Sequence, residues 1–185
     1  STLTSEYRFL DADKPEGEFK LVQSRIRGVE YSATHYKDFL YILTNKDDAV
    51  NFKLMKTPIS QPGVENWEEV IPHREEVLLE DIDIFEKHVV ISERSNGLNR
   101  LKVMTWDNSE SYYIPFDNET YTAYTGTNPD FNTDILRFTY NSMTTPTSVV
   151  DFNMTTRVKT VKKEQEVLGG FDKKNYISDR IWATA

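Results

Sequence analysis

The sequence predicts an all-β fold built from a repeating four-stranded antiparallel unit. Two series of segments recur along the chain, and in each series the intervals are 49 and 48 residues. The aligned positions are Ile42, Ile91 and Thr139 in the first series, and Phe52, Leu101 and Val149 in the second. Four short strands recurring at this period are typical of a β-propeller blade, because one small twisted sheet cannot bury both faces without neighbours stacked around an axis. We therefore expect a partial β-propeller of about three and a half blades.

The segments fall into five regions in chain order. Residues 1–28 are expected to form the outer two strands of a half blade, with EYRFLDAD and FKLVQSR as its strands. Three full blades are expected at 29–75, 76–118 and 119–168, and an exit segment at 169–185. A chain that begins halfway through a blade does not close a ring of four to eight blades. We therefore expect a piece of a larger propeller.

Strand composition within each unit fits this assignment. The second strands FLYIL and VVI are apolar on both faces, as required of strands sandwiched between neighbouring sheets. The last strand of the third blade is rich in basic residues, with Lys159, Lys162 and Lys163 around Val161, which is typical of an exposed outer edge. Asn96-Gly97 predicts a tight hairpin turn between the second and third strands of its blade.

Composition limits the classes of function. The chain has 185 residues, a net charge of -8 and no cysteine, so it offers neither disulfides nor thiolate chemistry. The acidic balance argues against a nucleic-acid partner, since phosphate binding needs clustered Lys and Arg. No apolar run reaches the roughly 20 residues needed to span a bilayer, so no membrane partner is expected. We expect a cytoplasmic location, with the periplasm as the alternative.

Four stretches resemble the propeller of prolyl oligopeptidase family serine peptidases, and most closely its oligopeptidase B (protease II) branch. They are VLLEDIDIF, SERSNGLNRL, LRFTYNSMTTPTSV and GGFDKKNYISDRIWATA. The resemblance implies a propeller inserted in the N-terminal part of an α/β-hydrolase domain. Tyr176, Ser178, Arg180, Trp182 and Ala183 match the segment that leads back into that domain, which is the partner expected for this chain.

The resemblance also implies a function. In the parent enzyme such a propeller covers the active site and admits oligopeptide substrates while excluding folded proteins. Relatives in the oligopeptidase B branch cleave after Lys or Arg. We therefore expect a non-catalytic propeller fragment of a serine oligopeptidase, with an independent propeller-type protein-interaction module as the alternative.

No residue pattern in the chain points to catalysis. None of the seven glycines brackets a serine as Gly-x-Ser-x-Gly, so no nucleophile elbow is present. His35, His73 and His88 are the three histidines, and none has a metal-binding His-x-x-x-His spacing. We expect no catalytic residue, no cofactor and no metal site, and the isolated chain is expected to be inactive.

Six residues remain as candidates for contacts with a channel or another domain. Asp81 and Asp83 could bind a cation or attract a basic peptide, or they could be solvated positions on a strand edge. Glu93 and Arg94 are adjacent at the end of a strand and could form an ion pair across blades or with another domain. The resemblance places Tyr176 and Arg180 in the segment that joins the two domains.

A propeller fragment is also expected to self-associate. Cutting a ring uncovers two blade faces, and an apolar patch of several hundred Å² is rare on a soluble monomer. The half blade would also present unpaired backbone groups along its inner strand.

Overall fold

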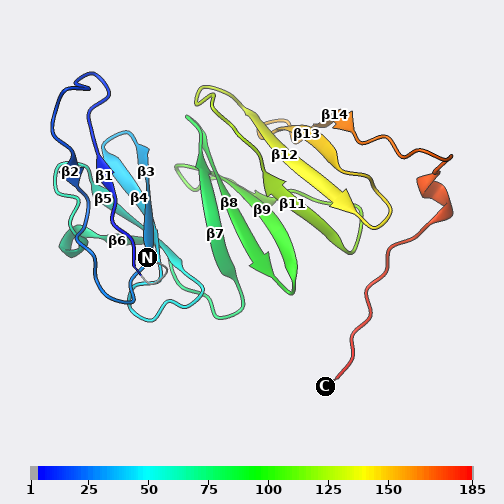
Figure 1. Ribbon diagram of the computed structural model, residues 1–185, viewed down its shortest axis with the longest axis horizontal. Coiled ribbons are helices and arrows are strands. Elements are labelled where there is room, and N and C mark those ends of the chain that lie inside the picture. The colour runs from blue at the N-terminus through cyan, green and yellow to red at the C-terminus, as the bar shows by residue number, and fades with distance from the viewer. Residues whose placement is uncertain (1–3, 185) are drawn as a thin grey trace. The chain divides into compact units, whose positions relative to one another are not determined.

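The structure is a computed structural model that describes residues 4–184 (Figure 1). Its strands form three four-stranded antiparallel sheets and one two-stranded sheet, and strands follow one another in each sheet in chain order. The chain divides into two compact units, one ending at Leu79 and the next beginning at Glu80. The predicted all-β fold of about three and a half four-stranded units is confirmed.

The first unit contains one complete sheet. Its strands are β3 (Tyr31–Tyr36), β4 (Phe39–Thr44), β5 (Lys53–Pro58) and β6 (Glu68–Ile71), with the 3-10 helix η1 (Val64–Asn66) between β5 and β6. β4 and β5 are the two most buried strands, and Ile42 of β4 pairs in register with Met55 of β5 and Ala33 of β3. Burial decreases toward β6, which is the outer strand. This gradient follows the sequence, because the apolar run FLYIL occupies the second strand.

The two strands that precede this sheet are shorter than the sequence suggests. β1 (Arg8–Phe9) and β2 (Lys20–Leu21) pair with each other over two residues each. The connection between them, residues 10–19, is rich in charged residues and contains Pro15, and from residue 11 onward it is exposed. Pairing ends where no apolar side chain can be buried. Phe9 and Val22 still pack against the core of the first unit.

The hydroxyl of Tyr31 joins these short strands to the complete sheet. Tyr31 is 4% exposed, and its hydroxyl donates to the carbonyl oxygen of Gln23 at 2.7 Å. The same oxygen accepts from the backbone N–H groups of Tyr7 at 2.9 Å and Gln23 at 3.2 Å. Burial is the main reason why the pKa of Tyr31 is raised above its usual value. One side chain of β3 therefore satisfies backbone groups of both preceding segments.

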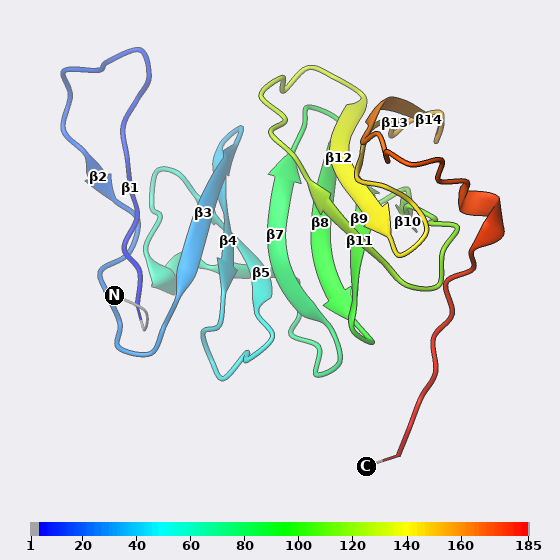
Figure 2. The same cartoon turned by 45° about the vertical axis from the view of Figure 1, so that its right-hand side comes forward.

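The second unit contains two complete sheets (Figures 1 and 2). The first sheet consists of β7 (Leu78–Ile84), which begins at the end of the first unit, β8 (His88–Ser95), β9 (Leu98–Thr105) and β10 (Ser111–Tyr113). The second consists of β11 (Tyr121–Thr125), β12 (Ile135–Ser142), β13 (Ser148–Asn153) and β14 (Lys159–Glu164).

Two predicted local features are confirmed in these sheets. In the β8–β9 turn, Asn96 has φ of 49° and Gly97 has φ of 73°, which are the left-handed angles that an Asn-Gly hairpin turn requires. Every residue of β14 is exposed, as its lysine-rich sequence predicts for an outer strand.

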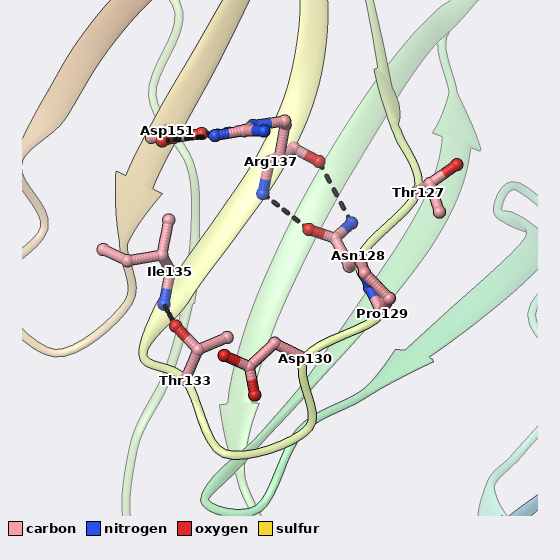
Figure 3. Close-up of a pocket in the computed structure, with 8 residues that line it drawn as sticks. All are labelled: Thr127, Asn128, Pro129, Asp130, Thr133, Ile135, Arg137 and Asp151. Carbon is pink, nitrogen blue, oxygen red and sulfur yellow. Dashed lines mark hydrogen bonds and ion pairs between the residues drawn. The ribbon is translucent and has the colours of Figure 1, made fainter.

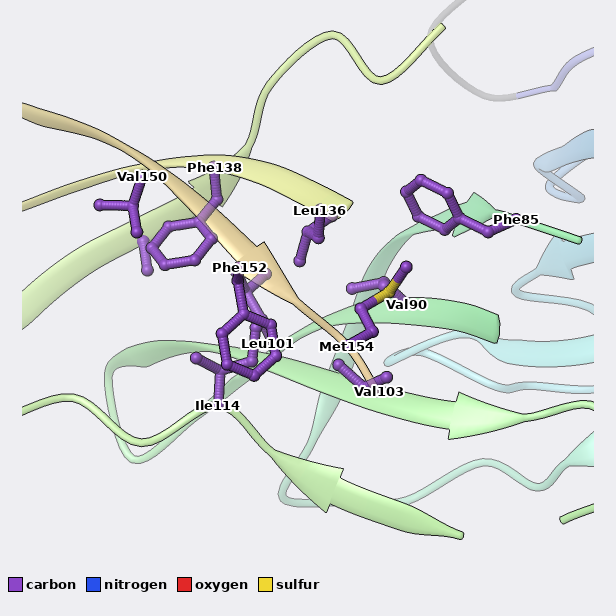
Figure 4. Packing of buried hydrophobic residues seen from close by; sticks show 11 residues of the cluster. Phe85, Val90, Leu101, Val103, Ile114, Leu136, Phe138, Val150, Phe152 and Met154 are labelled. Atoms are coloured by element: carbon purple, nitrogen blue, oxygen red, sulfur yellow. The ribbon is translucent and has the colours of Figure 1, made fainter. Parts of the chain in front are cut away.

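A single apolar layer joins the two sheets of the second unit (Figure 4). Leu101 and Val103 of β9 contribute from one side, while Phe138 of β12 and Phe152 of β13 contribute from the other. All four side chains are at most 1% exposed. Alternate residues of each strand point into this layer, so the period of two in the sequence decides which residues form it. Truncating a fully buried phenylalanine such as Phe152 to alanine typically costs about 3–5 kcal/mol.

We predict that Tyr31→Phe destabilises the first unit. The substitution keeps the ring but leaves the backbone groups of Tyr7 and Gln23 without the partner that the hydroxyl supplies. The expected loss in the free energy of unfolding is about 1–3 kcal/mol, measured by urea denaturation.

Tyr124→Phe is the matched control. It removes the same atom from a side chain that is 51% exposed, and its effect should stay within about 0.5 kcal/mol. Equal effects of the two substitutions would contradict the anchoring role of Tyr31.

Candidate functional site

The six residues singled out by the sequence lie in two places in the second unit. Asp81 and Asp83 are on β7, and Glu93 and Arg94 are on β8. Tyr176 and Arg180 belong to the exit segment, defined here as residues 169–184 of the described chain. Arg180 contacts Asn96 in the β8–β9 turn, two residues after Arg94.

The two carboxylates of β7 have different surroundings. Asp81 is exposed, and its Oδ1 atom accepts from the backbone N–H of Ile82 at 2.8 Å. Asp83 is half-buried, and burial raises the pKa of its carboxyl above the usual range, helped by the nearby charge of Asp81. Thr125 and Asn128 act against this change in pKa by hydrogen bonding. Asp83 therefore belongs to the contact between β7 and the end of β11, while Asp81 remains available to solvent.

Arg94 is engaged within its own sheet. Its Nη2 atom lies 2.7 Å from Oε1 of Glu80 on β7, and its Nε donates to the same oxygen at 2.8 Å. Nδ2 of Asn99 on β9 donates to the other carboxylate oxygen of Glu80 at 2.9 Å. Arg94 thus pairs across neighbouring strands of one sheet, whereas the sequence suggested a pair across blades or with another domain.

Glu93 points to the opposite face of β8 and is 1% exposed. The hydroxyl of Tyr113 on β10 donates to its Oε2 atom at 2.7 Å. Arg100 is the cross-strand neighbour of Glu93 in the β8–β9 register, and its guanidinium lies 3.6 Å from the centre of the Tyr113 ring. A buried carboxylate is tolerated only where hydrogen bonds and opposite charges compensate its lost hydration, and this arrangement supplies both.

The exit segment contains one short 3-10 helix, η2 (Lys173–Asn175). The side chain of Asp172 caps it by accepting from the backbone N–H of Lys174 at 3.0 Å. The rings of Phe171 and Tyr176 stack with their centres 5.5 Å apart, although Tyr176 is 60% exposed. Tyr176 thus stacks within the exit segment, while Arg180 reaches the β8–β9 turn.

The β11–β14 sheet bears a cavity of about 420 Å³ that sequence reasoning missed. Phe138, Val150 and Val161 form its apolar part, and Lys159 and Asp117 stand at its polar edge. The residues of the exit segment that line it are Lys173, Lys174 and Tyr176.

Lys159 is the distinctive group of this cavity. Its ammonium donates to the carbonyl oxygen of Pro115 and lies 5.0 Å from the centre of the Phe116 ring. Burial lowers its pKa, while the carboxylate of Asp117 opposes that change. An apolar wall with one cation at its edge is suited to contact a mixed apolar and polar surface.

A smaller cavity of about 210 Å³ lies beside the connection between β11 and β12 (Figure 3). Arg137 and Asp151 form a two-point ion pair there, with distances of 2.7 Å from Nε and 2.8 Å from Nη2. The Asn128 amide binds the backbone of Arg137 at both its N–H and its carbonyl, at 2.7 and 3.1 Å. The Arg137 guanidinium lowers the pKa of Asp151. These contacts hold the β11–β12 connection in place, and the polar groups of the cavity bind one another.

The described residues contain no group of three or more His, Asp or Glu side chains that could hold a metal ion. His88 and Asp134 are the nearest approach to a catalytic pair, but Nδ1 of His88 is 4.0 Å from Oδ1 of Asp134, beyond hydrogen-bond reach. No helix in the described part of the chain is long and apolar enough to cross a bilayer.

Comparison with known proteins identifies the kind of domain. Residues 1–165 match the family described as prolyl oligopeptidase, N-terminal beta-propeller domain. Dipeptidyl aminopeptidase BI of Pseudoxanthomonas mexicana is 37% identical over 185 residues, and protease 2 of Moraxella lacunata is 29% identical over 184 residues. Both alignments cover all of this chain but only 25% and 26% of the relatives. The chain thus spans about a quarter of their length.

Solved structures agree with this result. Oligopeptidase B from Trypanosoma brucei, in a closed form with covalently bound antipain, superposes with a TM-score of 0.86 at 34% identity, over 96% of this chain and 26% of that chain. Oligopeptidase B from Leishmania major gives a TM-score of 0.87 at 30% identity, over 100% of this chain and 27% of that chain. The resemblance expected from the sequence is confirmed.

We predict that His88 makes the protein less stable at acidic pH. His88 is 4% exposed, and burial lowers its pKa below the usual value of 6.5. The carboxylates of Asp134 and Glu110 oppose this change and the ammonium of Lys87 adds to it. The unfolded chain therefore binds the proton at a higher pH than the folded protein does. Stability is complete above about pH 6.5 and falls as the pH drops toward the lowered folded pKa.

Urea unfolding between pH 8 and pH 5 measures this effect. His88→Gln cannot take up the proton, so it should lose less unfolding free energy over the interval than the original protein does. Carboxylates that do not interact with His88 contribute equally to both proteins and cancel in the difference. Identical slopes for the two proteins would rule out the contribution of His88.

Proposed function

Because the chain belongs to the N-terminal β-propeller family of the prolyl oligopeptidases, we propose that it covers the active site of a serine oligopeptidase and restricts access to short peptides. The observation that carries the proposal is the match of residues 1–165 to this propeller domain. The relatives are longer peptidases, and the chain spans about a quarter of their length. The catalytic serine, aspartate and histidine belong to the peptidase domain in this proposal.

The features of the chain support a passive role. The sequence contains no Gly-x-Ser-x-Gly motif, and in the second unit Glu93 and Arg94 are engaged by neighbouring strands of their own sheet. A filter acts by size and by shape, so it needs a rigid scaffold and no reacting group. Closing an active site against water and large substrates is a recognised way to control a hydrolase.

Cleavage after Lys or Arg is the substrate preference that we propose for the whole enzyme. It is supported by the similarity to two oligopeptidase B structures at 34% and 30% identity. The net charge of -8 also favours the approach of basic peptides, because an acidic surface raises their local concentration. The relative that is 37% identical is named a dipeptidyl aminopeptidase, so an experiment must separate the two activities.

A substrate series on the longer polypeptide that includes the peptidase domain tests the proposal. Fluorogenic peptides with Lys or Arg at the cleavage site should be cut at least about tenfold faster than matched peptides with Ala or Pro, which corresponds to about 1.4 kcal/mol in the barrier. The same Lys-containing sequence placed within a folded protein should resist cleavage. Release of dipeptides from a free N-terminus as the main activity would reject the Lys or Arg preference, and ready cleavage of the folded protein would reject the filter.

We predict that the isolated chain has no peptidase activity. A serine peptidase needs an activated nucleophile with its base and an oxyanion hole, and the sequence contains no nucleophile elbow. Incubation with a Lys- or Arg-containing fluorogenic peptide, with and without a serine-directed phosphonate, measures this. Turnover above a boiled control that the phosphonate abolishes would contradict the prediction.

A further inference from the structure

The cavity of about 420 Å³ on the β11–β14 sheet has an apolar floor. Phe138 and Val150 pair in register there, lie side by side in Figure 4 and also belong to the apolar layer between the two sheets. Val161 of the outer strand β14 pairs with Val150 and extends the floor. The cavity therefore lies on the side of the β11–β14 sheet that faces the complete β7–β10 sheet.

The connection between β10 and β11, residues 114–120, supplies an aromatic wall. Phe116 stacks on Tyr140 of β12, with ring centres 5.2 Å apart and planes at 9°. The hydroxyl of Tyr140 donates to Oδ1 of Asn118 at 2.5 Å, and Nδ2 of Asn118 donates to Oγ1 of Thr144 at 3.3 Å. These contacts hold the wall in place without a ligand. A preformed apolar cavity with a few polar groups at its edge is typical of a small-ligand site.

Two opposite charges stand at the two ends of β14 beside this floor. Lys159 and Glu164 both line the cavity, with Val161 between them. Alternate residues of a strand share a side, and the register shift between Val149 and Val150 moves Glu164 to the side of Lys159 and Val161. Five strand intervals place the two charged residues at most about 16 Å apart along the strand.

Both charges keep capacity for a further partner. The ammonium of Lys159 donates to the carbonyl oxygen of Pro115, and Oγ of Ser148 lies 3.5 Å from Oε2 of Glu164. Within residues 4–184 neither charge belongs to an ion pair. Burial lowers the pKa of Lys159, but the carboxylate of Asp117 opposes this change and favours the charged amine. An ammonium has three donors, so two remain for a ligand.

We propose that this cavity binds a short peptide of three or four residues that has apolar side chains and two free termini. The carboxylate of the peptide pairs with Lys159 and its amine with Glu164, while its side chains lie on the valine floor and against Phe116. An extended peptide of this length spans about 10–14 Å, which fits the separation of the two charges.

Charge complementarity selects this ligand. A simple anion would use only the lysine end of the floor, and a neutral apolar molecule would use neither end. The inference goes beyond the proposed function, because the site needs no catalytic group and lies on the outer strand of its sheet.

Calorimetric titration with the tripeptide Leu-Ala-Phe tests the site in the longer polypeptide that includes the peptidase domain. A serine-directed phosphonate first blocks the active site, so that the peptide is neither cleaved nor bound there. We expect saturable binding that weakens at least about tenfold when both termini of the peptide are capped, since charge-assisted pairs at both ends are lost. Absence of saturable binding, or equal binding of the capped peptide, would overturn the proposal.

Variants of β14 show whether the binding occurs at this cavity. Lys159→Met removes the charge and keeps an apolar side chain, and it should weaken binding at least about fivefold. Lys162→Met is the matched control, because Lys162 is on the same strand but outside the cavity lining, where its charge acts on Asp151. Equal binding by the original protein and Lys159→Met, or equal losses in both variants, would reject the cavity as the site.

The orientation of the peptide is tested by changing both partners of each pair. Glu164→Gln should weaken binding of the free tripeptide but leave its N-acetylated form unaffected, and Lys159→Met should do the same for the C-amidated form. Additive losses would overturn the assigned pairs. A polypeptide that the phosphonate does not label would reject the proposed function, while the titrations would still decide whether the cavity binds the peptide.

Discussion

The apolar layer between the β7–β10 and β11–β14 sheets is the constraint on which the second unit depends. Phe138 and Phe152 meet Leu101 and Val103 in it, and all are essentially inaccessible to solvent. Protein interiors are packed as densely as crystals, so the side chains of such a layer have one well-packed arrangement. The β8–β9 turn and the β12–β13 loop therefore keep a fixed relation, because each ends a strand that contributes to the layer. Ser178 and Arg180 of the exit segment contact these two loops, so the position of this segment depends on the same packing.

Much of the fold could be predicted because its information is local or periodic. A period of 48 or 49 residues indicates the repeated unit, and Asn96-Gly97 marks a turn whose backbone angles few other residues adopt. The brief pairing of β1 and β2 could not be predicted, since FKLVQSR reads as a normal strand. Its length is limited by what it can pack against, and only Phe9 and Val22 reach the core.

The candidate residues show where sequence reasoning reaches its limit. Asp81 and Asp83 are two positions apart on one strand and should share a face, yet only Asp83 is half-buried. The β11–β12 connection near Asn128 causes the difference, and it lies some 45 residues further along the chain. Arg180 and Asn96 are 84 residues apart, and no periodic pattern relates them. The sequence does not distinguish Lys159 from the other lysines of β14. In the structure, Phe116 and Asp117 lie near its ammonium and set it apart.

Rigidity in this unit comes from apolar packing more than from its many charges. Exposed ion pairs contribute only about 0–1 kcal/mol each, because water and salt screen them. Burying one large apolar side chain contributes about 1.5–3 kcal/mol and is insensitive to moderate salt. A filter built in this way keeps its shape when ionic strength changes. Salt then acts on the approach of charged peptides and leaves the width of the passage unaltered, so selection by charge and selection by size are physically separate in the function that we propose.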